Sequence, residues 1–250
     1  MKHDFLDKHA HIDSPVHRID PRMKLIAAFA AIVIIVTEPL DGDFTPFALY
    51  FGIVVFVTVL TRVPVSYILK RCLIVLPFIL MASLFYPLSI VMEGGVIPSG
   101  NLHLYILPAI IIFSKGLLAV LLLIILTSTE RFHRLLLALR KLRMPRIIAT
   151  ISALLYRYIF LLIDEALKTS RARESRTPGK LRMSRMKVYG NQVATIFIRS
   201  WDRSEIIYKS MLSRGFQGEY PGMQKLDLTA LDLVISVSFV SALLAVRLLV

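Results

Sequence analysis

The sequence predicts an all-α membrane protein with about five transmembrane helices and long amphipathic cytoplasmic helices. Hydrophobic residues make up 56% of its 250 residues, and the mean hydropathy is +0.68. A soluble domain of this size cannot bury that much apolar surface, whereas a bilayer can cover it. The formal net charge of +13 is concentrated in residues 129–225, which hold 20 basic and 7 acidic residues, while the rest of the chain holds 10 of each. The apolar and the basic parts are therefore separate regions.

Five apolar runs approach the roughly 20 residues that cross a bilayer. They are residues 25–37, 44–60, 72–92, 105–127 and 230–249. The first run is short, so we expect its helix to begin near Pro21, which suits the first position of a helix, and Arg22 and Lys24 to reach back to the membrane surface. The predicted organisation is an N-terminal tail with four spans over 1–128, a basic segment over 129–225 and a last span over 226–250.

Basic residues in the short loops indicate the orientation, because the cytoplasmic side retains them. Those near the predicted inner ends of the spans are Arg18, Arg22, Lys24, Arg62, Lys70 and Arg71. The alternating loops, 38–43 and 93–103, contain no Lys or Arg. We therefore expect a multi-pass protein of the inner (plasma) membrane with a cytoplasmic N-terminus. Arg247, near the outer end of the last span, is the one exception.

Residues 147–163 could be counted as a sixth span. Basic residues flank them on both sides, and Arg157 lies in the middle. Since both ends have cytoplasmic character, we prefer a helix packed at the inner membrane surface, with a true crossing as the alternative.

Apolar residues recur at helical spacing throughout the basic segment. Pro145 divides its first part into two amphipathic helices. The breaker cluster 177–180 then precedes a third amphipathic stretch from Asn191 to Gly215. Long basic helices on the cytoplasmic side suit docking to a soluble partner.

Three strings of this sequence resemble the transmembrane T component of energy-coupling-factor (ECF) importers, most closely its cobalt-transport, CbiQ-type branch. They are SPVHRIDPRMKL (14–25), LLYRYIFLLIDEA (154–166) and IRSWDRSEIIYKSMLSRGFQGE (198–219). The resemblance implies a coupling subunit that works with a cytoplasmic ATPase pair and a substrate-binding membrane subunit, with a small accessory membrane subunit as a further candidate. It implies cobalt as the substrate, with nickel or a vitamin such as biotin as alternatives.

In that family two short motifs of the Ala-Arg-Gly kind end the coupling helices, and their arginines insert into grooves on the ATPase subunits. The matching positions are Ala172-Arg173-Glu174 and Ser213-Arg214-Gly215. The first departs from the pattern at Glu174 and the second at Ser213. Arg171 and Arg176 compete with Arg173 for the first role, so Arg214 is the firmer match. A guanidinium at a helix tip offers five rigid donors that never lose their charge. We expect Gly215 to end its helix in a left-handed conformation, which frees Phe216 to pack beside the partner.

The sequence contains no recognisable catalytic or nucleotide-binding motif. Nucleotide-binding Gly-x-x-x-x-Gly-Lys-Ser/Thr is absent, as are His-Glu-x-x-His and Gly-x-Ser-x-Gly. We therefore expect a chain that is not an enzyme and holds no cofactor or metal, with ATP bound by its partners. A membrane-embedded enzyme acting on an anionic lipid and a membrane-tethered nucleic-acid binder are the competing hypotheses; the second lacks exposed aromatic platforms.

The remaining polar candidates have structural interpretations. Cys72, the single cysteine, excludes an intramolecular disulfide, and Asp232 suits the start of the last helix. The tail histidines, His3, His9, His11 and His17, form no ligand set with acidic or cysteine partners and belong to a tail that we expect to be mobile.

Lys115 lies near the middle of the fourth apolar run, where a charge costs roughly 2.5–3.5 kcal/mol. It is therefore a candidate for contact with a polar group of a partner subunit inside the membrane. The alternative is that Pro108 breaks the run, so that the membrane helix starts later and Lys115 reaches outward.

Overall fold

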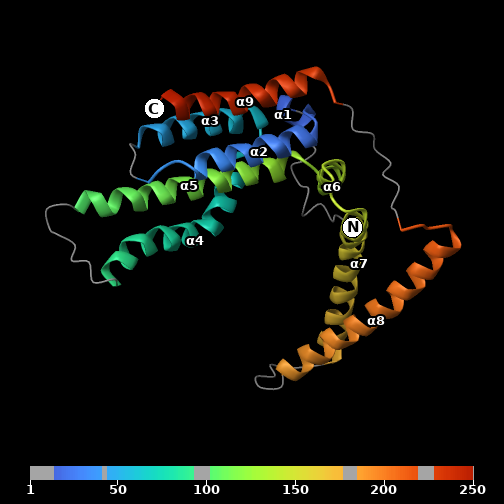
Figure 1. Cartoon of the computed structure of the whole chain (residues 1–250). Coiled ribbons are helices and arrows are strands. Elements are labelled where there is room, and N and C mark those ends of the chain that lie inside the picture. Colours follow the sequence, from blue (N-terminus) through green and yellow to red (C-terminus); the bar gives the residue numbers. More distant parts are fainter. Residues whose placement is uncertain (1–13, 41–43, 93–101, 177–184, 219–227, 250) are drawn as a thin grey trace. The chain divides into compact units, whose positions relative to one another are not determined.

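The computed structural model describes residues 14–40, 44–92, 102–176, 185–218 and 228–249, and every regular element in these ranges is an α-helix (Figure 1). In chain order the helices are α1 (Pro15–Arg18), α2 (Pro21–Val36), α3 (Thr45–Thr61), α4 (Val65–Met92), α5 (Leu102–Thr129), α6 (Phe132–Lys141), α7 (Arg146–Arg176), α8 (Arg185–Ser213) and α9 (Ala230–Leu249). The predicted all-α membrane fold is confirmed.

The chain divides into two compact units. One, called the bundle below, contains α1 to α5 and α9; the other, called the helix pair, contains α7 and α8. The division falls inside α6, between residues 138 and 139, and again between α8 and α9.

Four helices form the centre of the bundle, because α2 and α3 each pack against both α5 and α9 (Figure 1). Their shared core includes Ile35, Tyr50, Ile111, Leu118 and Leu243, which are all almost fully buried. Close packing of aliphatic and aromatic side chains therefore fixes the order of these helices around one axis.

Helix α4 packs against α5 and leaves its other side open. Leu73, Ile74 and Phe78 on α4 are exposed, as expected of side chains that face lipid. The contact with α5 is close at Gly116, where an added Cβ would lie 2.8 Å from Cγ2 of Ile79. A small residue at this point lets the two backbones approach each other.

All five predicted apolar runs are helical in the structure. By length and composition α4, α5 and α9 can cross a membrane, and α3 is a shorter apolar helix. Helix α2 begins at Pro21, as predicted, and the Asp20 carboxylate caps it by accepting from the Arg22 N–H at 2.8 Å.

Residues 147–163 lie inside α7, of which residues 146–175 also have the length and hydropathy of a span. Their placement at the membrane surface stays a prediction. Pro145 separates α6 from α7, as predicted, and Arg143, two residues beyond the end of α6, lies in the left-handed region (φ 73°).

The third amphipathic helix begins six residues earlier than predicted, at Arg185 rather than Asn191. Gly190 does not interrupt it, because a single glycine inside a helix costs only about 1 kcal/mol. The predicted breaker cluster 177–180 lies outside the described residues.

Candidate functional site

The second predicted motif closes the C-terminal end of α8. Ser213 is the last helical residue, and Gly215 adopts the predicted left-handed conformation at φ 80°. The Gly215 N–H donates to the Leu212 carbonyl at 2.9 Å, and the Phe216 N–H donates to the Met211 carbonyl at 3.0 Å. These two bonds form a Schellman motif, which satisfies carbonyls that the helix end would leave unpaired.

This cap leaves Arg214 at the tip of the helix with its side chain exposed. Within the described part of the chain, the Arg214 side chain has no hydrogen bond or ion pair. Its five N–H donors are therefore available to a partner. Phe216, directly beyond the cap, is half-buried.

The first predicted motif lies in the last turn of α7, and its arginine is already occupied. The Arg173 guanidinium stacks on the Tyr189 ring of α8 at 4.4 Å from the ring centroid. One terminal nitrogen donates to Oε1 of Gln192 at 3.0 Å, and the other donates to Oγ of Ser170 at 3.4 Å. Arg173 therefore ties α7 to α8. Ala172, Glu174 and the competing Arg171 are exposed on the same turn.

The two motifs are not brought together. Arg173 contacts Gln192 near the start of α8, and Arg214 lies 22 positions further along. At a rise of 1.5 Å per residue, this separates the two sites by about 33 Å. Between them a second link joins the two helices, because the Arg199 guanidinium binds the Glu165 carboxylate at 2.7 Å. The helix pair thus presents two separate arginine sites.

Lys115 finds its hydrogen-bond acceptors inside the chain. Its ammonium donates to the carbonyls of Val36 and Glu38 at 3.1 and 2.5 Å, at the C-terminal end of α2. A cation is favourable there, since the last carbonyls of a helix carry partial negative charge. The alternative in which Pro108 breaks the run is wrong, because α5 is continuous through Pro108. Contact of Lys115 with a partner subunit stays a prediction.

Lys115 belongs to a polar group that sequence reasoning missed. This group is called the outer cluster below, after the orientation that the sequence predicts. The Glu38 carboxylate accepts from the Tyr50 hydroxyl at 2.5 Å, and the Arg247 guanidinium lies 3.9 Å from it. Arg247 also donates to Oγ1 of Thr37 at 2.7 Å. The cluster joins α2, α3, α5 and α9 at one end of the bundle. The cluster supplies partners within the chain for Arg247, the exception to the predicted charge pattern, and this exception is the feature of the sequence that could have indicated the cluster.

A second polar group, called the inner cluster below, surrounds the start of α2. Lys24 and Glu130 form a buried ion pair, and Arg134 lies 3.7 Å from the same carboxylate. Burial raises the pKa of Glu130, and the neighbouring Lys24 ammonium opposes that shift. The prediction that Lys24 reaches the membrane surface is wrong, because its partner Glu130 follows α5 directly and holds it inside the bundle.

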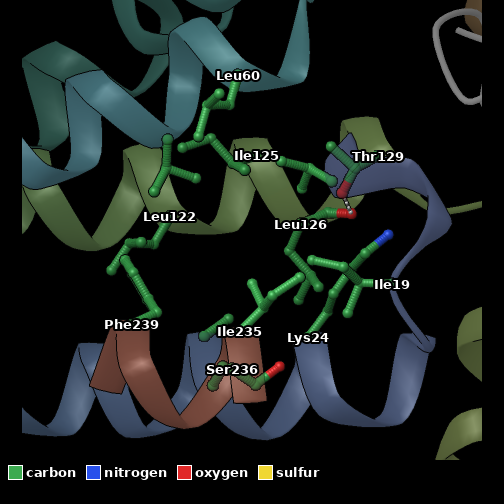
Figure 2. A pocket seen from close by; sticks show the side chains of 14 residues that line it. Ile19, Lys24, Leu60, Leu122, Ile125, Leu126, Thr129, Ile235, Ser236 and Phe239 are labelled. Carbon is green, nitrogen blue, oxygen red and sulfur yellow. Dashed lines mark hydrogen bonds between the residues drawn. The ribbon is translucent and has the colours of Figure 1, made fainter. Parts of the chain in front are cut away.

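Next to the inner cluster lies an apolar cavity of about 140 Å³ between α1, α2, α3, α5 and α9 (Figure 2). Figure 2 shows Leu122 and Phe239 reaching into it from opposite sides, with Lys24 at one end. Its polar lining side chains are Lys24, Thr129 and Ser236. Since Lys24 is paired with Glu130, this lining supplies no free acid–base pair for catalysis.

Of the other polar candidates, Asp232 has the structural role that the sequence suggests. Asp232 lies in the first turn of α9 and accepts from the Thr229 N–H at 3.1 Å, which caps the helix. His17 departs from the predicted mobile tail, since it is buried in α1 with Nδ1 2.6 Å from the Ser14 hydroxyl. His3, His9 and His11 lie outside the described residues. Among the residues that the structure describes, no group of three or more His, Cys, Asp or Glu could hold a metal.

The chain is similar to known proteins over most of its length. The family CbiQ, described as cobalt transport protein, matches residues 13–226. An uncharacterized protein of Methanocaldococcus jannaschii is 26% identical over 92% of this chain and 80% of its own length. A protein of Methanocorpusculum labreanum, named as a fused cobalt transport protein CbiMQ, is 28% identical over 86% of this chain and 38% of its own length. The energy-coupling factor transporter transmembrane protein EcfT of Bacillus subtilis is 29% identical over 82% of each chain.

Proposed function

The chain belongs to the CbiQ family, the transmembrane components of energy-coupling-factor transporters, and from this we propose that it is the coupling subunit of an ATP-driven cobalt importer. In this role it links ATP hydrolysis by a pair of partner ATPases to a substrate-binding membrane subunit. A small accessory membrane subunit is a further candidate partner. The chain itself performs no chemical reaction and lies in the inner membrane with its N-terminus in the cytoplasm.

The observation that carries the proposal is that the Arg214 guanidinium is exposed and makes no hydrogen bond or ion pair with the described residues. A 29-residue amphipathic helix ends in a capped turn that exposes this arginine and leaves its donors unoccupied. A helix laid in a groove with a free guanidinium at its tip is a strong recognition element for carboxylates and carbonyls. The tip of α8 thus suits insertion into an ATPase groove.

The separation of the two motifs supports a pair of ATPases rather than one. Sites about 33 Å apart on two linked helices can engage two subunits at once. When ATP draws those subunits together, α7 and α8 must approach or tilt. A substrate-binding membrane subunit that rests on the same helices would tilt with them. In this way ATP hydrolysis would be coupled to movement of the substrate-binding subunit.

Cobalt is proposed because the matching family and the relative from Methanocorpusculum labreanum are both named for cobalt transport. Nickel or a vitamin is the alternative, because the EcfT relative has a name without a substrate. A membrane-embedded enzyme acting on an anionic lipid has no observation in its favour among the described residues.

The proposal is tested by cobalt uptake in cells that express this chain together with the other subunits of its transporter. We expect uptake to require this chain and to fall about tenfold or more in Arg214→Ala, the scale of losing one partner of a buried charge pair. Arg203→Ala is the matched control, because Arg203 is an exposed arginine on the same helix.

Equal uptake by Arg214→Ala and wild type at matched membrane levels would overturn the anchoring role. Wild type that binds ATPases but imports no cobalt would move the substrate to nickel or a vitamin and leave the coupling role in place.

A further inference from the structure

Arg173 and Arg214 match the same kind of motif, yet only one of them is available to a partner. The Arg173 side chain is 21% exposed, with the Tyr189 ring against its guanidinium at 4.4 Å. In the plane of the guanidinium, the two terminal nitrogens bind Gln192 and Ser170. A groove on another protein that encloses the whole guanidinium would need the same donors and the same face. Full insertion of Arg173 into such a groove therefore requires it to leave these contacts.

Glu174, where the motif departs from the family pattern, contributes to this arrangement. Its carboxylate lies 3.5 Å from a terminal nitrogen of Arg173 and accepts from the Ser170 hydroxyl at 3.2 Å. A small residue at this position could make neither contact. The departure thus adds a negative charge beside the arginine that the family uses as an anchor.

We propose that Tyr189, Gln192 and Glu174 form a latch that stores the Arg173 guanidinium within the helix pair until an ATPase subunit competes for it. The proposal rests on the proposed function, in which Arg173 is the second anchor. It adds an order to assembly: Arg214 docks first because its donors are free, and Arg173 docks second because it must first leave Tyr189 and Gln192.

The size of the effect follows from the contacts that must break. A partly exposed cation–π contact and one hydrogen bond to a neutral amide together favour the latched state about tenfold. Partner affinity is reduced by the fraction of molecules that are competent to bind, so the latch lowers affinity by a similar factor. Removing it should therefore tighten binding, which is the opposite of what damage to the fold would do.

The first test needs no partner. The full chain in lipid nanodiscs is treated with phenylglyoxal, which modifies accessible guanidinium groups, and the rate at each arginine is read by peptide mass spectrometry. We expect Arg173 to react about tenfold more slowly than Arg171, an exposed arginine on the same helical turn. The protection should disappear in the double variant Tyr189→Ala/Gln192→Ala and persist in Tyr189→Phe, which keeps the ring. Equal rates at Arg173 and Arg171 in wild type would overturn the latch.

The second test measures the affinity of the purified ATPase pair of the same transporter for the full chain. We expect about fivefold to tenfold tighter binding in Tyr189→Ala/Gln192→Ala and a smaller gain in Glu174→Ala. In a chain that already carries Arg173→Ala, the same latch substitutions should leave the affinity unchanged. The latch residues then have no Arg173 guanidinium to hold. A gain that survives Arg173→Ala would overturn the latch, since Tyr189 or Gln192 would be touching the partner directly.

The two proposals fail in different ways. A wild-type chain that binds no ATPase overturns the proposed function, and the role of the latch with it. A wild-type chain that binds the ATPase pair with an affinity unchanged by the latch variants overturns the latch alone.

Discussion

The bundle and the helix pair differ in how their charged side chains are partnered. In the bundle, the inner and outer clusters pair buried charges with partners from other helices, as in Lys24 with Glu130. In the helix pair, large apolar side chains such as Val193, Phe197, Trp201 and Ile206 are exposed, and the Arg214 guanidinium is unoccupied within the described residues. Surface of this kind marks a binding region. The bundle exposes apolar side chains as well, such as Leu73 and Phe78 on α4, but it pairs its buried charges, whereas the tip of α8 keeps its donors for the partner that we propose.

The largest effect is expected when one partner of a buried ion pair in the bundle is removed. Glu130→Ala removes the partner of the buried Lys24 ammonium, and we expect it to lower the free energy of unfolding by about 3–5 kcal/mol. The measurement is chemical unfolding of the full chain in detergent micelles, followed by circular dichroism.

The control for Glu130→Ala is the double variant Lys24→Met/Glu130→Met, which removes both charges and keeps the volume of the side chains. It should cost much less than the single variant, because no unpaired charge remains buried: Arg134, the other neighbour of Glu130, is 33% exposed. A single variant as stable as the double one would show that the ion pair is hydrated rather than buried.

Removing a buried acceptor from the outer cluster should lower the free energy of unfolding by a smaller amount. Glu38→Ala leaves the Tyr50 hydroxyl buried without its acceptor, since the Tyr50 side chain is fully buried. We expect a loss of about 2 kcal/mol in the free energy of unfolding, within the range for an unsatisfied buried donor. Glu38→Gln keeps an acceptor for Tyr50 and should lose about half as much. Equal losses for the two variants would place the stabilisation in the charge of Glu38, and hence in its attraction to Arg247 and Lys115.

Much of this fold could be predicted from composition and helical periodicity, but the pairing of charges could not. The start of α2 at Pro21 and the left-handed Gly215 follow from local rules for helix ends, which act within a few residues. Lys24 was misplaced because its partner Glu130 is 106 positions away in the sequence. Hydropathy treats a lone lysine beside an apolar run as a surface group, and it carries no information about such distant partners.

The two arginine motifs also show that contacts between distant residues could not be predicted from the sequence. The sequence placed Arg173 and Arg214 at helix ends by resemblance, and both lie there. It could not distinguish an occupied guanidinium from a free one, because Tyr189 and Gln192 contact Arg173 only when α8 packs on α7. One signal was present: Glu174 placed a carboxylate where the family pattern has a small residue.

The smallest effect on the free energy of unfolding is expected for the ion pair that links the two helices of the helix pair. Arg199 and Glu165 form an ion pair at 2.7 Å, as close as a good buried pair, but the Arg199 side chain is 60% exposed. Water already solvates an exposed pair, so Arg199→Ala should change the free energy of unfolding by less than about 1 kcal/mol. Unfolding at low and high salt checks the reason, because screening should abolish what little the pair contributes. A loss in Arg199→Ala as large as that in Glu130→Ala would mean that the helix pair has a buried interior of its own, and the contrast between scaffold and docking surface would no longer hold.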